Sequence, residues 1–487
     1  MSNNAGLILL VLAVAGSYGW AVRGTTVGKE KGAMLPGALL GIFLAWFTGS
    51  PVIRENFWIF CAAGALAMAV GGTETYAQTM DFVKSAKKAP KPLMGNGGLA
   101  LKGFLWFGIF GAILGMAFTA MSGAVYRVWE LAAVFAAMPF LRALGIRIFN
   151  LPFDKEKGIR PKIYLSRDRF EEWGGMLFML IELAVFFAVK GDAFALILAG
   201  CSALGGAVGW VISINMMRIS MYPKKNGKYI FGALQLKGMI DNWKIMEYTL
   251  GAVGALGAGV GFILGFPALQ PHIAVIEGRG TLWSPLADAG LDKALSFAAI
   301  ALIIFGGELF FVWIFEKKFE HRLKKGERVG DIAEQVLYTY LSVPLMLLGA
   351  VDFSRMISIL VIYWVLMVEM LFNRDKLPAH KSSLKFRWPI ALIGVFYLAL
   401  EVCYHLIGGV SITLFTPLFL YLAVYYFIQI FFYDLLPHRM EARRELAKQE
   451  GTRLRPRHFG AMLTQEGFKF IQMAFIAIMA WKLGMIG

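Results

Sequence analysis

Residues 99–121 have the sequence LALKGFLWFGIFGAILGMAFTAM, an apolar stretch whose one ionisable residue is Lys102. A helix of about twenty apolar residues spans the hydrocarbon core of a bilayer. Apolar blocks of this length recur along the 487-residue chain, which is 58% hydrophobic and has a mean hydropathy of +0.62. The blocks are continuous, whereas the strands of a membrane barrel alternate apolar and polar residues. The sequence therefore predicts an all-α polytopic integral membrane protein.

Fourteen such blocks are predicted to be membrane-spanning helices, with boundaries accurate to a few residues. They lie at 5–22, 33–49, 56–73, 99–121, 127–146, 173–190, 193–214, 246–267, 294–315, 336–351, 355–373, 388–408, 411–433 and 468–486. The gaps between them are short, so we expect a single membrane domain. The longest gap, 434–467, is basic and is expected to lie against anionic lipid on the cytoplasmic side.

The distribution of charge predicts the orientation of the chain. There are 48 Lys and Arg against 32 Asp and Glu, a formal net charge of +16, which in a soluble protein would suggest nucleic acid. In a membrane protein, basic residues instead collect in cytoplasmic loops. Of the 48, 39 lie in alternate gaps, beginning with 23–32, when Lys469 at the edge of the last span is counted with its gap. We therefore expect these gaps to be cytoplasmic, both termini to face outward, no nucleic-acid partner, and a location in the bacterial cytoplasmic membrane.

A weak internal repeat appears at an offset of about 142 residues. Residues 30–35 (EKGAML) share four of six positions with 172–177 (EWGGML), and residues 65–71 (ALAMAVG) share five of seven with 203–209 (ALGGAVG). Such repeats often surround the binding site of a transporter. The two copies are predicted to be parallel and to contain four helices each. They would cover 33–146 and 173–315, and the basic gap at 374–387 suggests a decayed third copy at 336–433.

The segment joining the first two spans is the densest polar motif. Residues 20–32 (WAVRGTTVGKEKG) contain three glycines and two threonines, whose backbone N–H groups could line an anion, and Arg23 adds a planar donor. The motif lacks the residue order of a nucleotide-binding P-loop. The alternative is a tight basic turn with Arg23 against lipid phosphate. The candidate substrate-binding residues here and before the eighth span are Trp20, Arg23, Thr25, Thr26 and Trp243.

Ionisable residues inside predicted spans form a second group, because each costs roughly 2.5 to 3.5 kcal/mol near the bilayer centre. Glu182, Glu308 and Glu401 lie in this position, and His405 follows Glu401 by one helical turn. A carboxylate in a low dielectric can take up and release a proton near neutral pH. We therefore predict that these four residues couple transport to protons. The alternative is that each makes a buried hydrogen bond between helices.

A third group of acidic residues lies toward the cytoplasmic ends of the spans. Glu30, Glu74 and Glu247 lie on three different predicted helices, and acid–base chemistry on a sugar needs two carboxylates. They are the candidate catalytic residues if the protein is an integral membrane enzyme of glycosidase or transferase type. The favoured function is a proton-coupled secondary transporter, a symporter, for a small polar or anionic solute. We expect no metal or cofactor, and the oligomeric state stays open.

Overall fold

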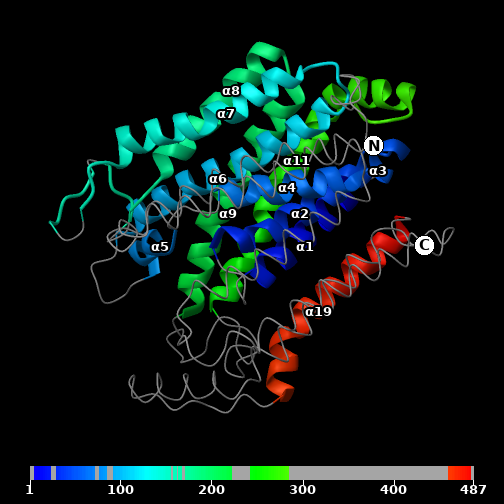
Figure 1. The fold of residues 1–487 in the computed structure, drawn as a ribbon. Coiled ribbons are helices and arrows are strands. Elements are labelled where there is room, and N and C mark those ends of the chain that lie inside the picture. The colour runs from blue at the N-terminus through cyan, green and yellow to red at the C-terminus, as the bar shows by residue number, and fades with distance from the viewer. Residues whose placement is uncertain are drawn as a thin grey trace, which may run out of the picture. The chain divides into compact units, whose positions relative to one another are not determined.

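A computed structural model describes residues 5–23, 29–71, 76–84, 91–154, 157–161, 163–166, 170–221, 242–283 and 459–483. These residues are all-α apart from one isolated bridge between Asp154 and Ile159 (Figure 1). Five of the described helices are long and apolar enough to cross a membrane, namely Pro92–Ala120, Val128–Asn150, Trp173–Lys190, Ala193–Met221 and Asn242–Arg279. The prediction of an all-α integral membrane protein therefore agrees with the structure.

The described part of the first compact unit contains ten α-helices and one π-helical turn. They are α1 (Ala5–Arg23), α2 (Lys29–Phe47), α3 (Pro51–Glu55), α4 (Phe57–Gly71), α5 (Tyr76–Lys84), α6 (Pro92–Ala120), α7 (Val128–Gly145), η2 (Ile146–Asn150), α8 (Trp173–Lys190), α9 (Ala193–Met221) and α11 (Asn242–Arg279). A second unit contains α19 (Phe459–Lys482). Helices thus lie where hydropathy places the first eight spans and the last one, and the five predicted spans between 294 and 433 fall outside the described residues.

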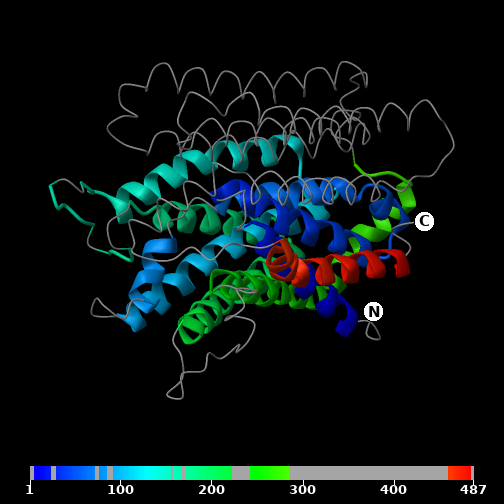
Figure 2. The same ribbon diagram turned by 90° about the horizontal axis from the view of Figure 1, so that it is seen from below.

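Six of the described helices form a closed ring. Each packs against the next in the order α1, α2, α4, α6, α9 and α11, and α11 packs back against α1 (Figures 1 and 2). Aromatic side chains fill the ring, since Phe118 of α6 stacks on Phe60 of α4 at 4.2 Å between centroids and lies 6.3 Å from Phe262 of α11. As a result α6 is the most enclosed of the long helices, with 94% of its most apolar window buried.

Glycines allow the close approach of these helices. A Cβ atom added to Gly103 of α6 would lie 2.3 Å from the carbonyl oxygen of Gly206 of α9, and one added to Gly37 of α2 would lie 2.1 Å from that of Gly64 of α4. Small residues at helix contacts are a usual feature of membrane proteins, where backbones pack directly against one another. Glycines of the sequence therefore lie at the helix contacts of the ring.

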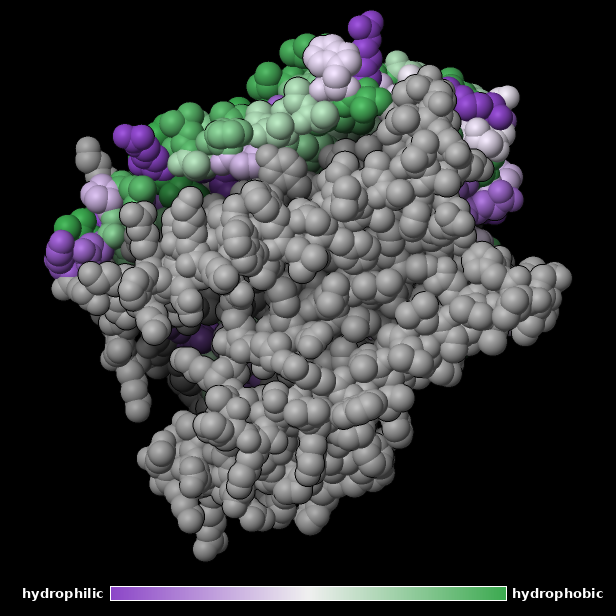
Figure 3. All heavy atoms as spheres, in the orientation of Figure 1, coloured by the Kyte–Doolittle hydropathy of each residue, from purple (hydrophilic) through white to green (hydrophobic). Residues whose placement is uncertain are grey.

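Helices α7 and α8 form a hairpin outside the ring. Among the described helices, α7 packs against α8, and α8 packs against α6 and α9. Only 33% and 39% of their apolar windows are buried, and hydrophobic side chains gather on the surface over this hairpin (Figure 3). The exposed apolar residues are Val128, Trp129, Phe140, Leu144, Ile148, Ile181, Val185 and Val189. Such a continuous apolar face suits contact with lipid.

The helices alternate in direction, so their ends form two groups. At one end, Lys244 near the start of α11 donates to the carbonyl of Ala21 near the end of α1, at 2.7 Å. This end also contains Lys102, in the third turn of α6, and is called the Lys102 end. At the opposite end, the hydroxyl of Thr119, close to the end of α6, donates to Asp192, which precedes α9, at 2.5 Å. It is called the Asp192 end.

Candidate functional site

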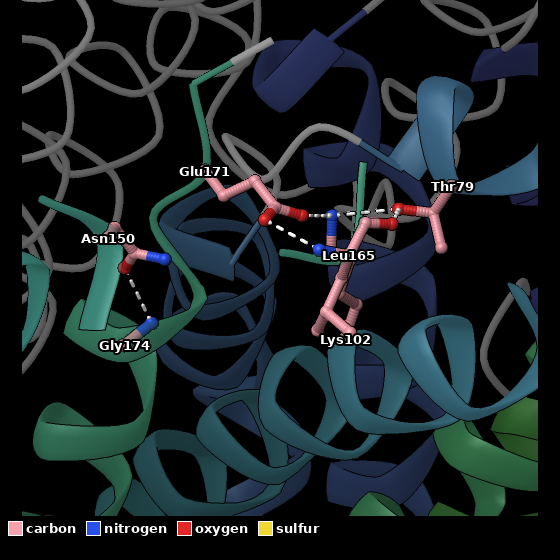
Figure 4. A network of polar contacts seen from close by, with 6 residues as sticks. All are labelled: Thr79, Lys102, Asn150, Leu165, Glu171 and Gly174. Carbon is pink, nitrogen blue, oxygen red and sulfur yellow. Dashed lines mark hydrogen bonds and ion pairs between the residues drawn. The ribbon is translucent and has the colours of Figure 1, made fainter. Parts of the chain in front are cut away.

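Lys102 is a fully buried cation on the most enclosed helix. Its side chain is 1% exposed, and its Nζ donates to Glu171 Oε1 at 3.0 Å and to Thr79 Oγ1 at 3.0 Å (Figure 4). Glu171 is also 1% exposed and lies two residues before α8. A lysine inside an apolar helix is costly unless an acidic partner and further hydrogen bonds compensate its charge. The structure supplies both.

The Glu171 carboxylate also accepts a hydrogen bond from the segment before α8. Its Oε2 accepts the backbone N–H of Leu165 at 2.9 Å, and the carbonyl of Leu165 accepts the Thr79 hydroxyl at 2.7 Å (Figure 4). Thr79, on α5, thus bridges Lys102 to the segment before α8. Three elements far apart in sequence meet here around one cation and one anion. We call Thr79, Lys102, Leu165 and Glu171 the Lys102 cluster.

The next residue, Glu172, pairs with a second buried cation. Arg142 of α7 donates to Glu172, and the two side chains are 3% and 6% exposed. Beside them, Asn150 Oδ1 accepts the backbone N–H of Gly174 in the first turn of α8, at 2.9 Å (Figure 4). Two consecutive glutamates therefore neutralise buried cations on two different helices, α6 and α7.

A third ion pair lies at the start of α11. Lys244 Nζ contacts Glu247 Oε2 at 2.6 Å, and both side chains are less than 10% exposed. The sequence places Glu247 among the candidate catalytic residues. In the structure its carboxylate is engaged by a cation one turn away on the same helix.

The aromatic residues predicted to bind substrate take different positions. Trp20 is 1% exposed and packs in the ring, edge-on to Trp106 at 5.1 Å and stacked on Phe107 at 6.0 Å between centroids. Trp243 is 41% exposed, and the Lys84 ammonium lies 4.7 Å from its ring centroid. Trp20 therefore belongs to the packed core of the ring in this conformation, and Trp243 lies at the surface.

Most of the other predicted site residues fall outside what the structure describes. Glu182 is half-buried in the middle of α8, whereas Glu171 of the Lys102 cluster lies before the start of that helix. Among the remaining candidates, residues or side chains outside the described part are Arg23, Thr25, Thr26, Glu30, Glu74, Glu308, Glu401 and His405. Their roles stay predictions.

Glu171 and Glu172 are not among the site residues that the sequence predicts, because both lie in the basic gap before α8, where acidic residues are expected to be solvated. Two adjacent glutamates directly before an apolar block, with two basic residues inside or at the end of earlier blocks, are the signal that could have found these pairs. Buried charges are almost always paired, so an unexplained buried lysine predicts an acidic partner.

A polar cluster of another kind lies at the Asp192 end. Asp192 is 2% exposed, and its Oδ2 accepts the hydroxyls of Thr119 and Tyr126, each at 2.5 Å. Its Oδ1 accepts the N–H of Ala195 at 2.9 Å and so caps α9. Burial, and then the neighbouring Asp192 carboxylate, raise the pKa of Tyr126 above its ordinary value. This cluster, formed by Thr119, Tyr126, Asp192 and Ala195, is held by hydroxyl and backbone donors.

Comparison of the chain with protein-family models, curated proteins and solved structures finds no match. The function must therefore be argued from the chemistry of the two polar clusters. The Lys102 cluster is the stronger candidate for a functional site. It places full charges inside an apolar helix, whereas the hydrogen bonds of Asp192 include the ordinary capping of a helix.

Proposed function

We propose that the protein is a proton-coupled secondary transporter, a symporter for a small polar or anionic solute in the bacterial cytoplasmic membrane. The proposal includes fourteen spans, with both termini outside and the Lys102 end on the cytoplasmic side. The charge distribution supports this orientation, because the basic gaps 23–32 and 147–172 adjoin the Lys102 end.

The observation that carries the proposal is the set of buried ion pairs at the Lys102 end. The side chains of Lys102, Arg142 and Lys244 are at most 9% exposed, and each contacts an acidic residue. Ionisable groups within membrane helices are expensive and commonly mark a solute or ion path. If buried ion pairs exchange partners, a charged solute can pass them without leaving a buried charge unpaired. An anionic solute is the natural third partner for buried cations.

The remaining parts of the proposal rest on the sequence. Glu182, Glu308, Glu401 and His405 are the proposed proton-coupling residues, and segment 20–32 the proposed edge of the solute path. The parallel four-helix repeats are supported by the matches at nearly constant offset. The basic segment 434–467 would contact anionic lipid.

Transport can be tested with purified protein in proteoliposomes. A mixture of small polar and anionic metabolites is added under an imposed pH gradient, and both the lumen and the total pool are measured by mass spectrometry. We expect one class of solute to accumulate unchanged, dependent on the gradient, with accumulation reduced in Glu247→Gln. The matched control is Glu277→Gln, because Glu277 is exposed on the same helix and should leave accumulation unchanged.

A chemical change in the total pool, independent of the gradient, would contradict transport. It would instead support the alternative, an integral membrane enzyme with carboxylates at the cytoplasmic boundary. That alternative predicts that Glu30→Gln or Glu74→Gln abolishes the change in the pool. Accumulation that is the same with and without the pH gradient would contradict the proton coupling but not transport itself.

A further inference from the structure

The α7–α8 hairpin continues beyond its helices in a short protruding segment. The described residues among 151–163 follow η2 and extend outward from the Lys102 end, and we call them the hairpin tip (Figures 1 and 2). Asp154 and Ile159 exchange backbone hydrogen bonds at 2.9 and 2.8 Å across a turn. Gly158 takes a positive φ of 68° in this turn. The tip therefore has a defined backbone structure of its own.

The chain on each side of the tip is fastened to the rest of the unit. Before the tip, Asn150 Oδ1 accepts the backbone N–H of Gly174 at 2.9 Å. After it, Leu165 accepts the Thr79 hydroxyl at 2.7 Å and donates its N–H to Glu171 at 2.9 Å. These contacts fix where the tip begins and ends relative to the helices.

Helix length places the start of the tip at the level of the lipid headgroups. The apolar stretch formed by α7 and η2, Val128–Asn150, contains 23 residues. At about 1.5 Å per residue it is about 34 Å long, slightly more than the roughly 30 Å of hydrocarbon in a bilayer. If this stretch spans the membrane, the residues that follow Asn150 emerge where the acyl chains meet the phosphate groups.

Large apolar side chains are exposed along η2 and the tip. Ile148 of η2 is 54% exposed, and it continues the apolar face of α7 that includes Leu144. In the tip, Leu151, Ile159 and Ile163 are 38%, 40% and 47% exposed. Apolar residues that continue an already exposed apolar face indicate a surface that contacts a partner. The continuity with the α7–α8 face indicates that this partner is lipid.

Exposed basic side chains lie among these apolar ones. Arg147 precedes Ile148, Lys157 is 75% exposed, and Arg160 follows Ile159. Residues 146–163 contain five basic residues and two acidic ones, a formal charge of +3. Figure 3 shows hydrophobic and hydrophilic residues side by side where the tip protrudes. A surface that is both apolar and basic is typical of segments that lie at the boundary of an anionic membrane.

We propose that the hairpin tip binds anionic phospholipid at the membrane surface. Its apolar side chains contact the upper part of the acyl chains, and Arg147, Lys157 and Arg160 contact the phosphate groups. The charge favours lipid over a second copy of the chain, because two identical basic surfaces repel each other. This inference does not depend on the proposed transport function.

The contacts of the basic residues are compatible with phosphate binding. Lys157 Nζ lies 3.6 Å from Asp154 Oδ2 in an exposed pair, which is a weak interaction, so the ammonium can also contact a phosphate. The Arg160 guanidinium lies over the ring of Tyr164, at 5.0 Å from its centroid. Stacking uses the face of a guanidinium, whereas phosphate binds its edge.

The surroundings of the tip can be measured with a fluorophore at position 159. In full-length protein whose three native cysteines are alanine, Ile159→Cys is labelled with an environment-sensitive probe and placed in nanodiscs that hold one copy each. The discs contain phosphatidylcholine with increasing fractions of phosphatidylglycerol. We expect a nitroxide near the lipid headgroup to quench the probe more strongly than iodide in the water. We also expect phosphatidylglycerol to shift the emission further to the blue.

Charge variants separate the recognition of anionic lipid from simple insertion. One basic residue near an anionic surface contributes about fivefold to binding. Lys157→Gln should therefore require about fivefold more phosphatidylglycerol for half of the emission shift, and should leave the emission in phosphatidylcholine unchanged. Arg127→Gln is the matched control, because Arg127 is exposed at the opposite end of α7 and its replacement removes the same charge. It should leave the titration unchanged.

Three results would overturn the proposal. Stronger quenching by iodide than by the lipid nitroxide would place the tip in water. The same emission with and without phosphatidylglycerol would show that the tip does not recognise anionic lipid. Protection from iodide only in vesicles that hold several copies would identify a second copy of the chain as the partner. None of these measurements requires transport, so a failure of solute accumulation would contradict the proposed function without deciding this inference.

Discussion

At the scale of the residue, the protein buries charged side chains with two different kinds of partner. Lys102 and Arg142 are buried in helices and are each matched by a glutamate. Asp192 is equally buried, and hydroxyl and backbone donors surround it. A carboxylate held by several hydrogen-bond donors is fixed in position by that network. The two ends of the helices therefore differ in chemistry as well as in position.

The hydrogen bond from Tyr126 to Asp192 gives the stability of the folded protein a testable dependence on pH. An unfolded tyrosine has a pKa of about 10, and burial together with Asp192 raises the pKa of Tyr126 above it in the folded protein. Folding therefore gains stability that is fully present below about pH 10 and is lost as the pH rises through the folded pKa. We expect Tyr126→Phe to be less stable than the parent by about 1 to 2 kcal/mol at pH 7.

This difference should narrow above about pH 10, because only the parent has the ionising phenol. The measurement is thermal unfolding of both proteins in detergent between neutral and strongly alkaline pH. A difference that stays constant across this range would show that the Tyr126 proton is not linked to folding.

At the scale of the element, hydropathy predicts where the helices lie but not where they begin and end. Apolar length predicts α6 and α11, but α6 begins at Pro92, before the predicted residue 99, and α11 continues to Arg279, beyond the predicted residue 267. Polar turns lower the hydropathy of a window without ending a helix, and α11 continues through Pro267 and Pro271. The short α5, which supplies Thr79, is not predicted, because it lies in a basic gap whose polar residues lower the hydropathy of the window.

Hydropathy also could not separate the ring from the hairpin. Helices α6 and α7 have similar mean hydropathies of 1.8 and 1.7, yet they are 94% and 33% buried in their apolar windows. In a membrane, lipid and protein are equally acceptable neighbours for an apolar side chain, so composition does not tell which one a helix contacts. Glycine spacing carries part of that information, since Gly103 and Gly111 of α6 both face α9.

The contact between α6 and α9 predicts opposite effects for two glycines of α9. A Cβ atom at Gly206 would lie 2.3 Å from the Gly103 carbonyl oxygen, whereas Gly200 has no atom within 4 Å. We expect Gly206→Ala to destabilise the protein by about 1 to 3 kcal/mol through overpacking. Gly200→Ala should stabilise it by up to about 1 kcal/mol, because alanine is the better helix former. Thermal unfolding in detergent measures both, and equal effects would contradict the close contact.

At the scale of the whole molecule, the ring and the hairpin differ in how tightly they are packed. The ring is closed by glycine contacts and filled by aromatic residues, which makes movement inside it costly. The hairpin packs against the ring through α8, which contacts α6 and α9. The order of the helices places the Lys102 cluster at the end where the sequence has its basic gaps, so the orientation of the chain decides which side of the membrane the cluster faces.

That orientation can be tested by labelling single cysteines in intact cells with a membrane-impermeant maleimide. Lys157 lies in the segment before α8 with its side chain 75% exposed, and Glu277 is exposed near the end of α11. The positive-inside rule predicts that the segment containing Lys157 is cytoplasmic. We expect Glu277→Cys to be labelled in intact cells and Lys157→Cys only after the membrane is permeabilised. The reverse pattern would place the Lys102 cluster at the outer face and both termini inside.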